Sequence, residues 1–250
     1  MAFKNASESH DHSRGILDLI YGYDSFLDSL SVIADFGCGA GLDTEWWATL
    51  TTRDDPPEPR NYLVYAVDKN ITKIDESIAK LKNVRVIESD FENGNVIPRK
   101  CDLLWAHDSF HYSTNPLLTL KNWNAQMTTN GMMVMCVPQN VHYQYNRLQN
   151  VGHDGMYFNY NVVNLMYMLA VSGFDCKDAY FYKNNNDPWL YAAVYKSHIE
   201  PMDTKTTTWH DLADLNLVNE SVKASLSTYG YIRQEDLITT WLDKDFYQMK

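Results

Sequence analysis

Residues 35–46 have the sequence DFGCGAGLDTEW, with glycine at positions 37, 39 and 41. A short apolar run, 31–37, leads into this stretch, and a segment with helical spacing, 42–52, follows it. Glycine at every second position predicts a sharp turn and a backbone that a ligand can approach closely. We therefore expect a strand, a glycine loop and a helix, which together form a candidate nucleotide site.

The spacing of the glycines does not fit a dinucleotide-binding loop. That fingerprint, GxGxxG or GxGxxA, ends in a small residue that lets the helix pack on the strand. Counted from Gly37 this place holds Leu42, and counted from Gly39 it holds Thr44. Asp35 would repel a pyrophosphate but suits a ligand with an ammonium group and ribose hydroxyls. A glycine turn in an unrelated α/β protein is the other interpretation.

Apolar runs alternate with segments of helical spacing as far as residue 138. This alternation predicts a parallel sheet with both faces covered by helices. The expected strands are 31–37, 61–68, 84–90, 101–108 and 132–138, and the expected helices are 13–29, 42–52, 71–82 and 115–127. A turn is expected at 129–131.

The pattern changes after residue 138. Residues 141–160 are too irregular for a regular element, and 161–173 predicts a helix ended by glycine. The segments 174–182 and 189–196 flank a polar turn, 183–188, which predicts an antiparallel hairpin at the sheet edge. Residues 205–250 are expected to form two further helices.

The composition restricts the class of protein. Hydrophobic residues make up 45% of the 250 residues, and we expect one domain over 1–250. The net charge of −11 and the lack of a basic cluster argue against a nucleic-acid partner. No apolar run approaches the ~18 residues of a membrane span, and no secretory signal is seen, so we expect a cytoplasmic protein. Four cysteines without a CxxC pair predict free thiols.

The acid-x-Gly-x-Gly-x-Gly pattern of DFGCGAG is similar to the nucleotide-binding motif of class I S-adenosylmethionine-dependent methyltransferases. The resemblance continues in order through VYAVDKN, SDFEN, CDLLWAHDSFHYSTNP, TTNGMMVMCVP and AVSGFD, and covers about residues 30–196. It implies an α/β fold with a seven-stranded, mostly parallel sheet of order 3-2-1-4-5-7-6, strand 7 antiparallel, and helices on both faces. It also implies a lid insertion at 141–160 and leaves 205–250 as a helical extension.

The resemblance implies where S-adenosylmethionine binds and S-adenosylhomocysteine forms. Asp68 ends the second strand, where a carboxylate can accept both ribose hydroxyls, although a solvated capping role is the alternative. Asp90 is placed to take the adenine amino group and Phe91 to pack on the ring, and an upstream basic residue such as Arg14, or His12, to reach the methionine carboxylate. The expected cofactor-binding residues are Arg14, Asp35, Gly37, Cys38, Gly39, Gly41, Asp68, Lys69, Asp90, Phe91 and His107.

The substrate class depends on the residues that follow the fourth strand. Methyltransferases that act on adenine, cytosine N4 or glutamine amides resemble one another in an Asn/Asp-Pro-Pro-aromatic motif at this place, where 107–110 instead contain HDSF. The Pro-Cys nucleophile of cytosine C5 enzymes is also missing, because Cys101 begins the strand and lacks the proline. We therefore expect a small-molecule acceptor with an oxygen, nitrogen or carbon nucleophile.

His111 is the expected general base, because an imidazole titrates near neutral pH and this residue lies farther into the loop than His107. The alternative is that His111 begins a helix and makes only local hydrogen bonds. His107 and Asp108 complete the expected catalytic set. The expected substrate-binding residues are Tyr112 and, in the lid, His142, Tyr145, Arg147, His153 and Tyr157.

Other functions stay open at this stage. No metal site is expected, because Asp108 is a lone acid after the fourth strand and the adjacent residues His10, Asp11 and His12 point in different directions. A protein or tRNA methyltransferase that docks its substrate on 205–250 is one alternative. A non-catalytic S-adenosylmethionine-binding module is another. The protein is expected to be a monomer or a homodimer.

Overall fold

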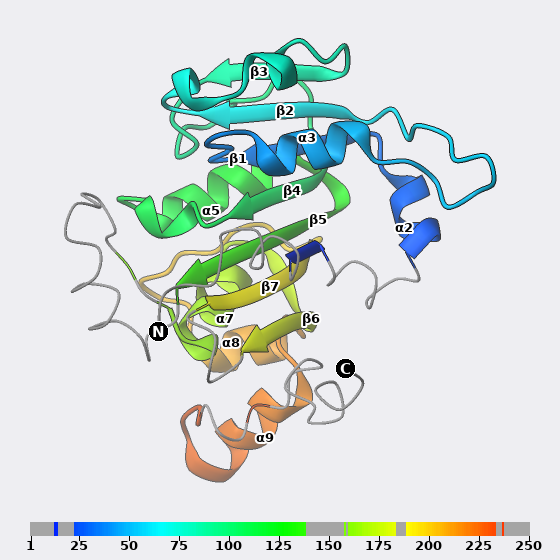
Figure 1. The fold of residues 1–250 in the computed structure, drawn as a ribbon. Helices are drawn as coiled ribbons and strands as arrows, with labels where there is room; N and C mark the ends of the chain where they lie inside the picture. Colours follow the sequence, from blue (N-terminus) through cyan, green and yellow to red (C-terminus); the bar gives the residue numbers. More distant parts are fainter. Residues whose placement is uncertain are drawn as a thin grey trace, which may run out of the picture.

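The computed structural model describes residues 13–14, 23–138, 158, 160–183, 189–233 and 237. Its centre is a seven-stranded sheet of order β3-β2-β1-β4-β5-β7-β6 (Figure 1). Neighbours from β3 to β5 pair in parallel, whereas β7 is antiparallel to both β5 and β6. The expected strand order is confirmed. The strands are β1 (Val32–Phe36), β2 (Leu63–Asp68), β3 (Val84–Glu88), β4 (Cys101–His107), β5 (Met127–Pro138), β6 (Phe174–Lys183) and β7 (Trp189–Lys196).

Helices cover both faces of this sheet, with α3 on one face and α5 and α7 on the other (Figure 1). Alternate residues of β4 face opposite ways, as a strand requires: Trp105 packs with Trp47 of α3, and Leu104 packs with Trp123 of α5. The described helices are α2 (Tyr23–Ser29), α3 (Leu42–Thr49), η1 (Ile71–Lys73), α4 (Glu76–Ala79), η2 (Phe110–Tyr112), α5 (Pro116–Ala125), α7 (Val162–Val171), α8 (Trp209–Asp214) and α9 (Glu220–Tyr229).

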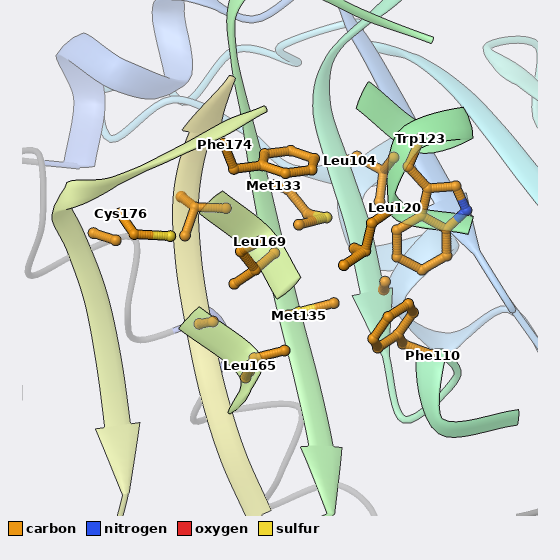
Figure 2. Close-up of a cluster of buried hydrophobic side chains, with 14 of the residues drawn as sticks. Leu104, Phe110, Leu120, Trp123, Met133, Met135, Leu165, Leu169, Phe174 and Cys176 are labelled. Atoms are coloured by element: carbon orange, nitrogen blue, oxygen red, sulfur yellow. The ribbon is translucent and has the colours of Figure 1, made fainter. Parts of the chain in front are cut away.

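The larger of two clusters of buried hydrophobic side chains lies between the sheet and the helices α5 and α7 (Figure 2). Two methionines of β5 meet leucines of α7 there, and full burial of each such side chain contributes about 1.5–3 kcal/mol before the entropy of ordering is subtracted. This packing holds α5 against β4 and so fixes the loop that joins them. The side chains labelled in this cluster include Leu120, Trp123, Met133, Met135, Leu165 and Leu169.

The helix expected over 71–82 is broken into η1 and α4, so that prediction was wrong. Asn70 caps η1 and Asp75 caps α4, each by accepting a backbone N–H two residues further on. Between the two, Ile74 is extended and lies against Gly41, where an added Cβ would be only 2.9 Å from Ile74 Cγ1. The helix stops because its apolar residue is used to cover the glycine loop.

Other boundaries differ less. The helix expected over 42–52 ends at Thr49, where Leu50 becomes extended. The turn expected at 129–131 lies inside β5, although Asn130 keeps a left-handed φ of 64° and the pairing with β4 changes register nearby. Of the helix expected over 13–29, residues 15–22 lie outside the described residues, as do 184–188 of the hairpin turn.

The C-terminal extension packs on the core. It supplies the expected helices α8 and α9, and Val218 and Val222 are completely buried. The Leu217 carbonyl accepts the Cys176 N–H at 2.9 Å, and Tyr167 of α7 donates to the Thr207 carbonyl at 2.6 Å. Residues 234–236 and 238–250 lie outside the described residues. The described part of the extension is therefore structural.

Glu92 joins the loop after β3 to the start of α5. Its carboxylate accepts the Thr114 N–H at 2.8 Å and the Asn115 N–H at 3.3 Å, together with the hydroxyls of Ser113 and Thr114. Burial alone would raise the pKa of this carboxyl, but the hydrogen bonds outweigh burial and hold the pKa below its usual 4.5. The stabilisation is therefore complete above pH 4.5 and is lost as the pH falls below it.

We expect Glu92→Gln to lower the free energy of unfolding at neutral pH by about 1 kcal/mol, since charged hydrogen bonds at a half-exposed site are lost. The difference between the two proteins should shrink as the pH falls through 4.5. Urea unfolding at neutral and acidic pH measures both effects. Glu76→Gln, which changes an exposed carboxylate paired with Lys80, is the matched control and should change little. A difference for Glu92→Gln that does not depend on pH would contradict this role.

Candidate functional site

The site lies where the sheet reverses its strand order. From β1 the chain proceeds outward to β2 and β3, and then returns to β4 on the other side of β1. In open α/β sheets the crevice at such a switch point binds ligands, at the carboxyl ends of the strands. The glycine loop follows β1, Asp68 ends β2, Asp90 follows β3 and His107 ends β4. The parallel strands therefore bring the predicted cofactor residues to one edge (Figure 1).

The glycine loop requires glycine for two reasons: its backbone has left-handed φ values, and a side chain would collide with neighbouring residues at some of these positions. Gly37, Gly39 and Gly41 have φ values of 82°, 53° and 88°, in the left-handed region that residues with a Cβ avoid. The N–H groups of Gly37 and Cys38 donate to the Val67 carbonyl at 2.8 and 3.1 Å, which joins the loop to β2. A Cβ on Gly39 would meet nothing within 4 Å. The backbone is therefore approachable at the middle glycine, as a bound nucleotide requires.

Ser109 fixes the loop after β4 against the glycine loop. Its hydroxyl donates to the Phe36 carbonyl at 2.7 Å, and an added Cβ on Gly37 would lie 2.3 Å from Ser109 Cβ. Gly37 is therefore needed for contact between two loops as well as for its own conformation. Sequence reasoning did not identify Ser109, because a serine in a loop carries no signal of a partner 73 residues away.

Asp68 lies at the end of β2, with its side chain partly exposed. One carboxylate oxygen accepts the Gly39 N–H at 3.0 Å and the other accepts the Asn70 N–H at 2.9 Å. The residue expected to accept ribose hydroxyls thus also supports the middle of the glycine loop. Its neighbour Lys69 is exposed.

Asp35 and Cys38, both in the glycine motif, are buried. Asp35 accepts the Thr44 hydroxyl at 2.6 Å and so connects β1 with the first turn of α3. Burial, and then the carboxylates of Asp35 and Asp68, raise the pKa of the Cys38 thiol far above its usual value. The thiol therefore stays protonated at neutral pH and contributes packing. All four cysteines are free and buried, as expected.

Asp90 and Phe91 follow β3 at the same edge. Asp90 is exposed and accepts the Glu92 N–H at 2.9 Å, which shapes the turn. Phe91 is partly buried, with its ring 5.8 Å from that of Trp123 in an edge arrangement. The Trp123 indole N–H donates to the Phe91 carbonyl at 2.8 Å. Phe91 is therefore held by α5, whereas the Asp90 side chain faces solvent.

Ser13 and Arg14 reach this edge from the N-terminal part of the chain. The Ser13 hydroxyl lies 3.0 Å from His107 Nδ1, and both side chains are buried. Arg14 Nε donates to Asp43 at 3.1 Å, and the guanidinium lies over the Trp46 ring at 4.9 Å. Arg14 was the expected partner of the methionine carboxylate, and the structure places it beside α3, against an acid of this chain.

The loop after β4 holds the predicted catalytic residues. Asp108 is exposed and has a left-handed φ of 52°, an unfavourable conformation for a residue with a side chain. His111 lies in η2 and is completely buried, with Nε2 3.5 Å from the Asp108 carboxylate. Tyr112 is half-buried, and burial, followed by the Asp108 charge, raises the pKa of its phenol. The structure thus brings Asp108, His111 and Tyr112 together beside His107.

Aromatic rings surround the far side of this loop. Phe110 stacks on Tyr160 at 5.4 Å, and the His111 ring lies 6.5 Å from that of Trp189 at the start of β7. Tyr160 is buried next to the end of β5, where its N–H donates to the Pro138 carbonyl. Its hydroxyl has no hydrogen-bond partner among the described residues. The expected lid residues His142, Tyr145, Arg147, His153 and Tyr157 lie outside the described residues.

Two negative observations apply to the described ranges alone. Within them, no three His, Cys, Asp or Glu side chains gather as metal ligands would. Nor does any helix in those ranges have the length and apolar character needed to cross a membrane.

We expect Gly37→Ala to destabilise the protein by about 2–4 kcal/mol. The new methyl group must displace buried Ser109, and alanine must adopt the left-handed backbone conformation that glycine has at this position. Gly39→Ala is the matched control, because it introduces the same backbone strain but places its Cβ in free space. It should lower the free energy of unfolding by about 1–2 kcal/mol. Chemical denaturation of the two variants measures the difference. Equal losses would show that the contact between Gly37 and Ser109 adds nothing.

Comparisons with known proteins agree with this arrangement. A family model described as a methyltransferase domain matches residues 34–135. No curated protein matches the chain in sequence. The fold is similar to that of the N-methyltransferase NodS from Bradyrhizobium japonicum, with a TM-score of 0.55, 12% identity, and coverage of 78% of this chain and 99% of NodS.

Two other solved structures share the fold. A protein from Listeria monocytogenes, described as a proposed S-adenosylmethionine-dependent methyltransferase, has a TM-score of 0.59 and 14% identity and covers 78% of this chain and 100% of its own. The 1,6-didemethyltoxoflavin-N1-methyltransferase from Burkholderia thailandensis, with its substrate and S-adenosylhomocysteine bound, has a TM-score of 0.50 and 16% identity and covers 76% and 84%.

Proposed function

We propose that the chain is a class I S-adenosylmethionine-dependent methyltransferase that transfers the methyl group of S-adenosylmethionine to a small-molecule acceptor, which the methyltransferase-domain match over residues 34–135 and the shared fold support. Its cofactor is S-adenosylmethionine. The observation that carries the proposal is the shared edge of β1, β2 and β4, where the Asp68 carboxylate contacts the open backbone of Gly39 and where His107 ends β4.

This edge suits the nucleoside in charge and in shape. Asp68 provides carboxylate oxygens for two ribose hydroxyls, and its present bond to the Gly39 N–H places those oxygens beside the loop. Gly39 leaves space for close approach of the ligand. Phe91, fixed by Trp123, offers an apolar ring to the adenine, and exposed Asp90 offers a carboxylate to its amino group.

A small acceptor is favoured by what surrounds the loop after β4. Within this loop Phe110 stacks on Tyr160, and the His111 ring lies near that of Trp189, so the polar groups of Asp108, His111 and Tyr112 stand beside aromatic rings. This surrounding suits a compact, partly apolar molecule with a polar reacting atom. The HDSF sequence at 107–110 differs from the motif of base and amide methyltransferases. The Burkholderia enzyme shows that this fold can hold a small acceptor.

Methyl transfer asks little covalent chemistry of the protein. S-adenosylmethionine, when bound, would supply an activated methyl group, and its methyl–sulfur bond would break as the acceptor atom bonds to carbon, with S-adenosylhomocysteine as the leaving group. The protein must align the acceptor with this group and remove a proton from the acceptor atom. We assign the proton to His111, with the Asp108 carboxylate 3.5 Å from Nε2 to stabilise the resulting imidazolium. Tyr112 is then a contact to the acceptor.

We expect Asp68→Ala to weaken S-adenosylhomocysteine binding at least tenfold, since both ribose hydroxyls lose their acceptor. Isothermal titration calorimetry with S-adenosylmethionine and S-adenosylhomocysteine measures this. Glu88→Ala, which removes an exposed carboxylate from β3, is the control and should bind normally. Unchanged affinity in Asp68→Ala would remove Asp68 from the site, and absence of heat with wild-type protein would overturn the cofactor assignment.

We expect His111→Gln to lower turnover by about 100-fold with little change in cofactor affinity, because general bases typically contribute that much. Acceptors are first found by incubating the enzyme and labelled S-adenosylmethionine with fractionated metabolite pools. Asp108→Asn should lower turnover less and shift the pH profile of kcat. An unaltered rate in a folded His111→Gln protein would end its candidacy as the base. Cofactor binding without labelling of any pool would favour a binding module.

A further inference from the structure

Ser13 and Arg14 connect the two sides of the switch point. Ser13 contacts His107, at the carboxyl end of β4, through a 3.0 Å contact between the hydroxyl and Nδ1. Arg14 contacts Asp43, in the first turn of α3, directly after the glycine loop. Because β1 and β4 are neighbours and the glycine loop leaves β1, these two consecutive residues join the carboxyl end of β4 to the helix that follows the glycine loop.

Asp43 is the centre of the contact on the α3 side. It is only 4% exposed, and its two carboxylate oxygens are used separately: Oδ1 accepts Arg14 Nε at 3.1 Å, and Oδ2 accepts the Trp105 indole N–H at 2.8 Å. A buried carboxylate is tolerated only when it is paired and hydrogen-bonded. Asp43 therefore joins three parts of the chain that are distant in sequence, namely Arg14, α3 and β4.

Two further contacts fix the guanidinium. Arg14 Nη2 lies 3.4 Å from the Leu42 carbonyl, and the group lies 4.9 Å from the centre of the Trp46 ring, within range of a cation–π interaction. These contacts hold Arg14 against the first turn of α3. Arg14 is thus placed to hold another part of the chain in position.

We propose that Ser13 and Arg14, held by His107 and Asp43, form a clasp across the switch point that retains the bound cofactor. The proposal rests on the proposed function, since the clasp acts on S-adenosylmethionine and its product. Arg14 and Asp43 are positioning residues in it and act through each other. Release of the product requires the clasp to open, so the clasp sets the dissociation rate.

Dissociation of S-adenosylhomocysteine from the full chain tests the clasp. Stopped-flow dilution is measured for Arg14→Ala, Asp43→Asn and the double variant, where Asp43→Asn keeps an oxygen for the Trp105 N–H. Each single variant should dissociate about tenfold faster, and the double variant no faster than either single one, because both remove the same contact. Ser13→Ala should dissociate faster by a smaller factor. Asp28→Asn, which changes the acid paired with Arg60, is the matched control and should behave as wild type.

A direct contact between Arg14 and the methionine carboxylate gives a different pattern. Arg14→Ala would then weaken S-adenosylhomocysteine while leaving 5′-deoxy-5′-methylthioadenosine, which lacks that carboxylate, unaffected, and Asp43→Asn would do little. That pattern, additive effects of the two substitutions, or unchanged dissociation in folded variants would each overturn the clasp. If Asp43→Asn fails to fold, Ser13→Ala and Arg14→Ala decide. Wild-type protein that does not bind S-adenosylhomocysteine would overturn the proposed function itself.

Discussion

The fit between Gly37 and Ser109 is the constraint on which the site depends. The chain leaves β1 with a left-handed residue, and the loop after β4 occupies the volume that a side chain would fill. The Ser109 hydroxyl then closes the contact on the carbonyl of Phe36. Because two neighbouring parallel strands end in loops that touch, the cofactor side and the acceptor side keep a fixed relation. Methyl transfer needs this, since the reacting atoms must be aligned closely.

Much of the fold could be predicted from the order of apolar runs. Parallel strands appear as continuous apolar segments, which located the first five strands, and the polar turn between β6 and β7 located the last two. Helix 71–82 could not be predicted correctly, because Ile74 leaves the helix to cover Gly41, a contact between residues 33 positions apart. The extended start of β5 was missed for a related reason, since its irregular pairing with β4 includes the turn-like Asn130.

The residues of the candidate site likewise fall into those that the sequence could predict and those that it could not. Residues at strand ends, such as Asp68 and His107, could be placed from the sequence, because parallel strands direct their carboxyl ends to one edge. Ser13, Asp43 and Ser109 could not, since each is an ordinary polar residue whose partner lies far along the chain. The acidic residues in the first turn of α3 suggest only a favourable helix start. It is the packing of Trp105 beneath them that makes Asp43 a junction.

The position of β7 has a consequence for synthesis of the protein. Among the described residues it is the last strand made, yet it lies inside the sheet and pairs with β5 on one side and β6 on the other. On a ribosome, β6 emerges before any strand that can pair with it, and β5 keeps an open edge until Lys196 has left the exit tunnel. Unpaired strand edges favour aggregation in partly folded chains. The helix α7 emerges earlier and can cover the apolar face of β5 in the meantime. The nascent chain therefore exposes less apolar surface before its sheet is complete.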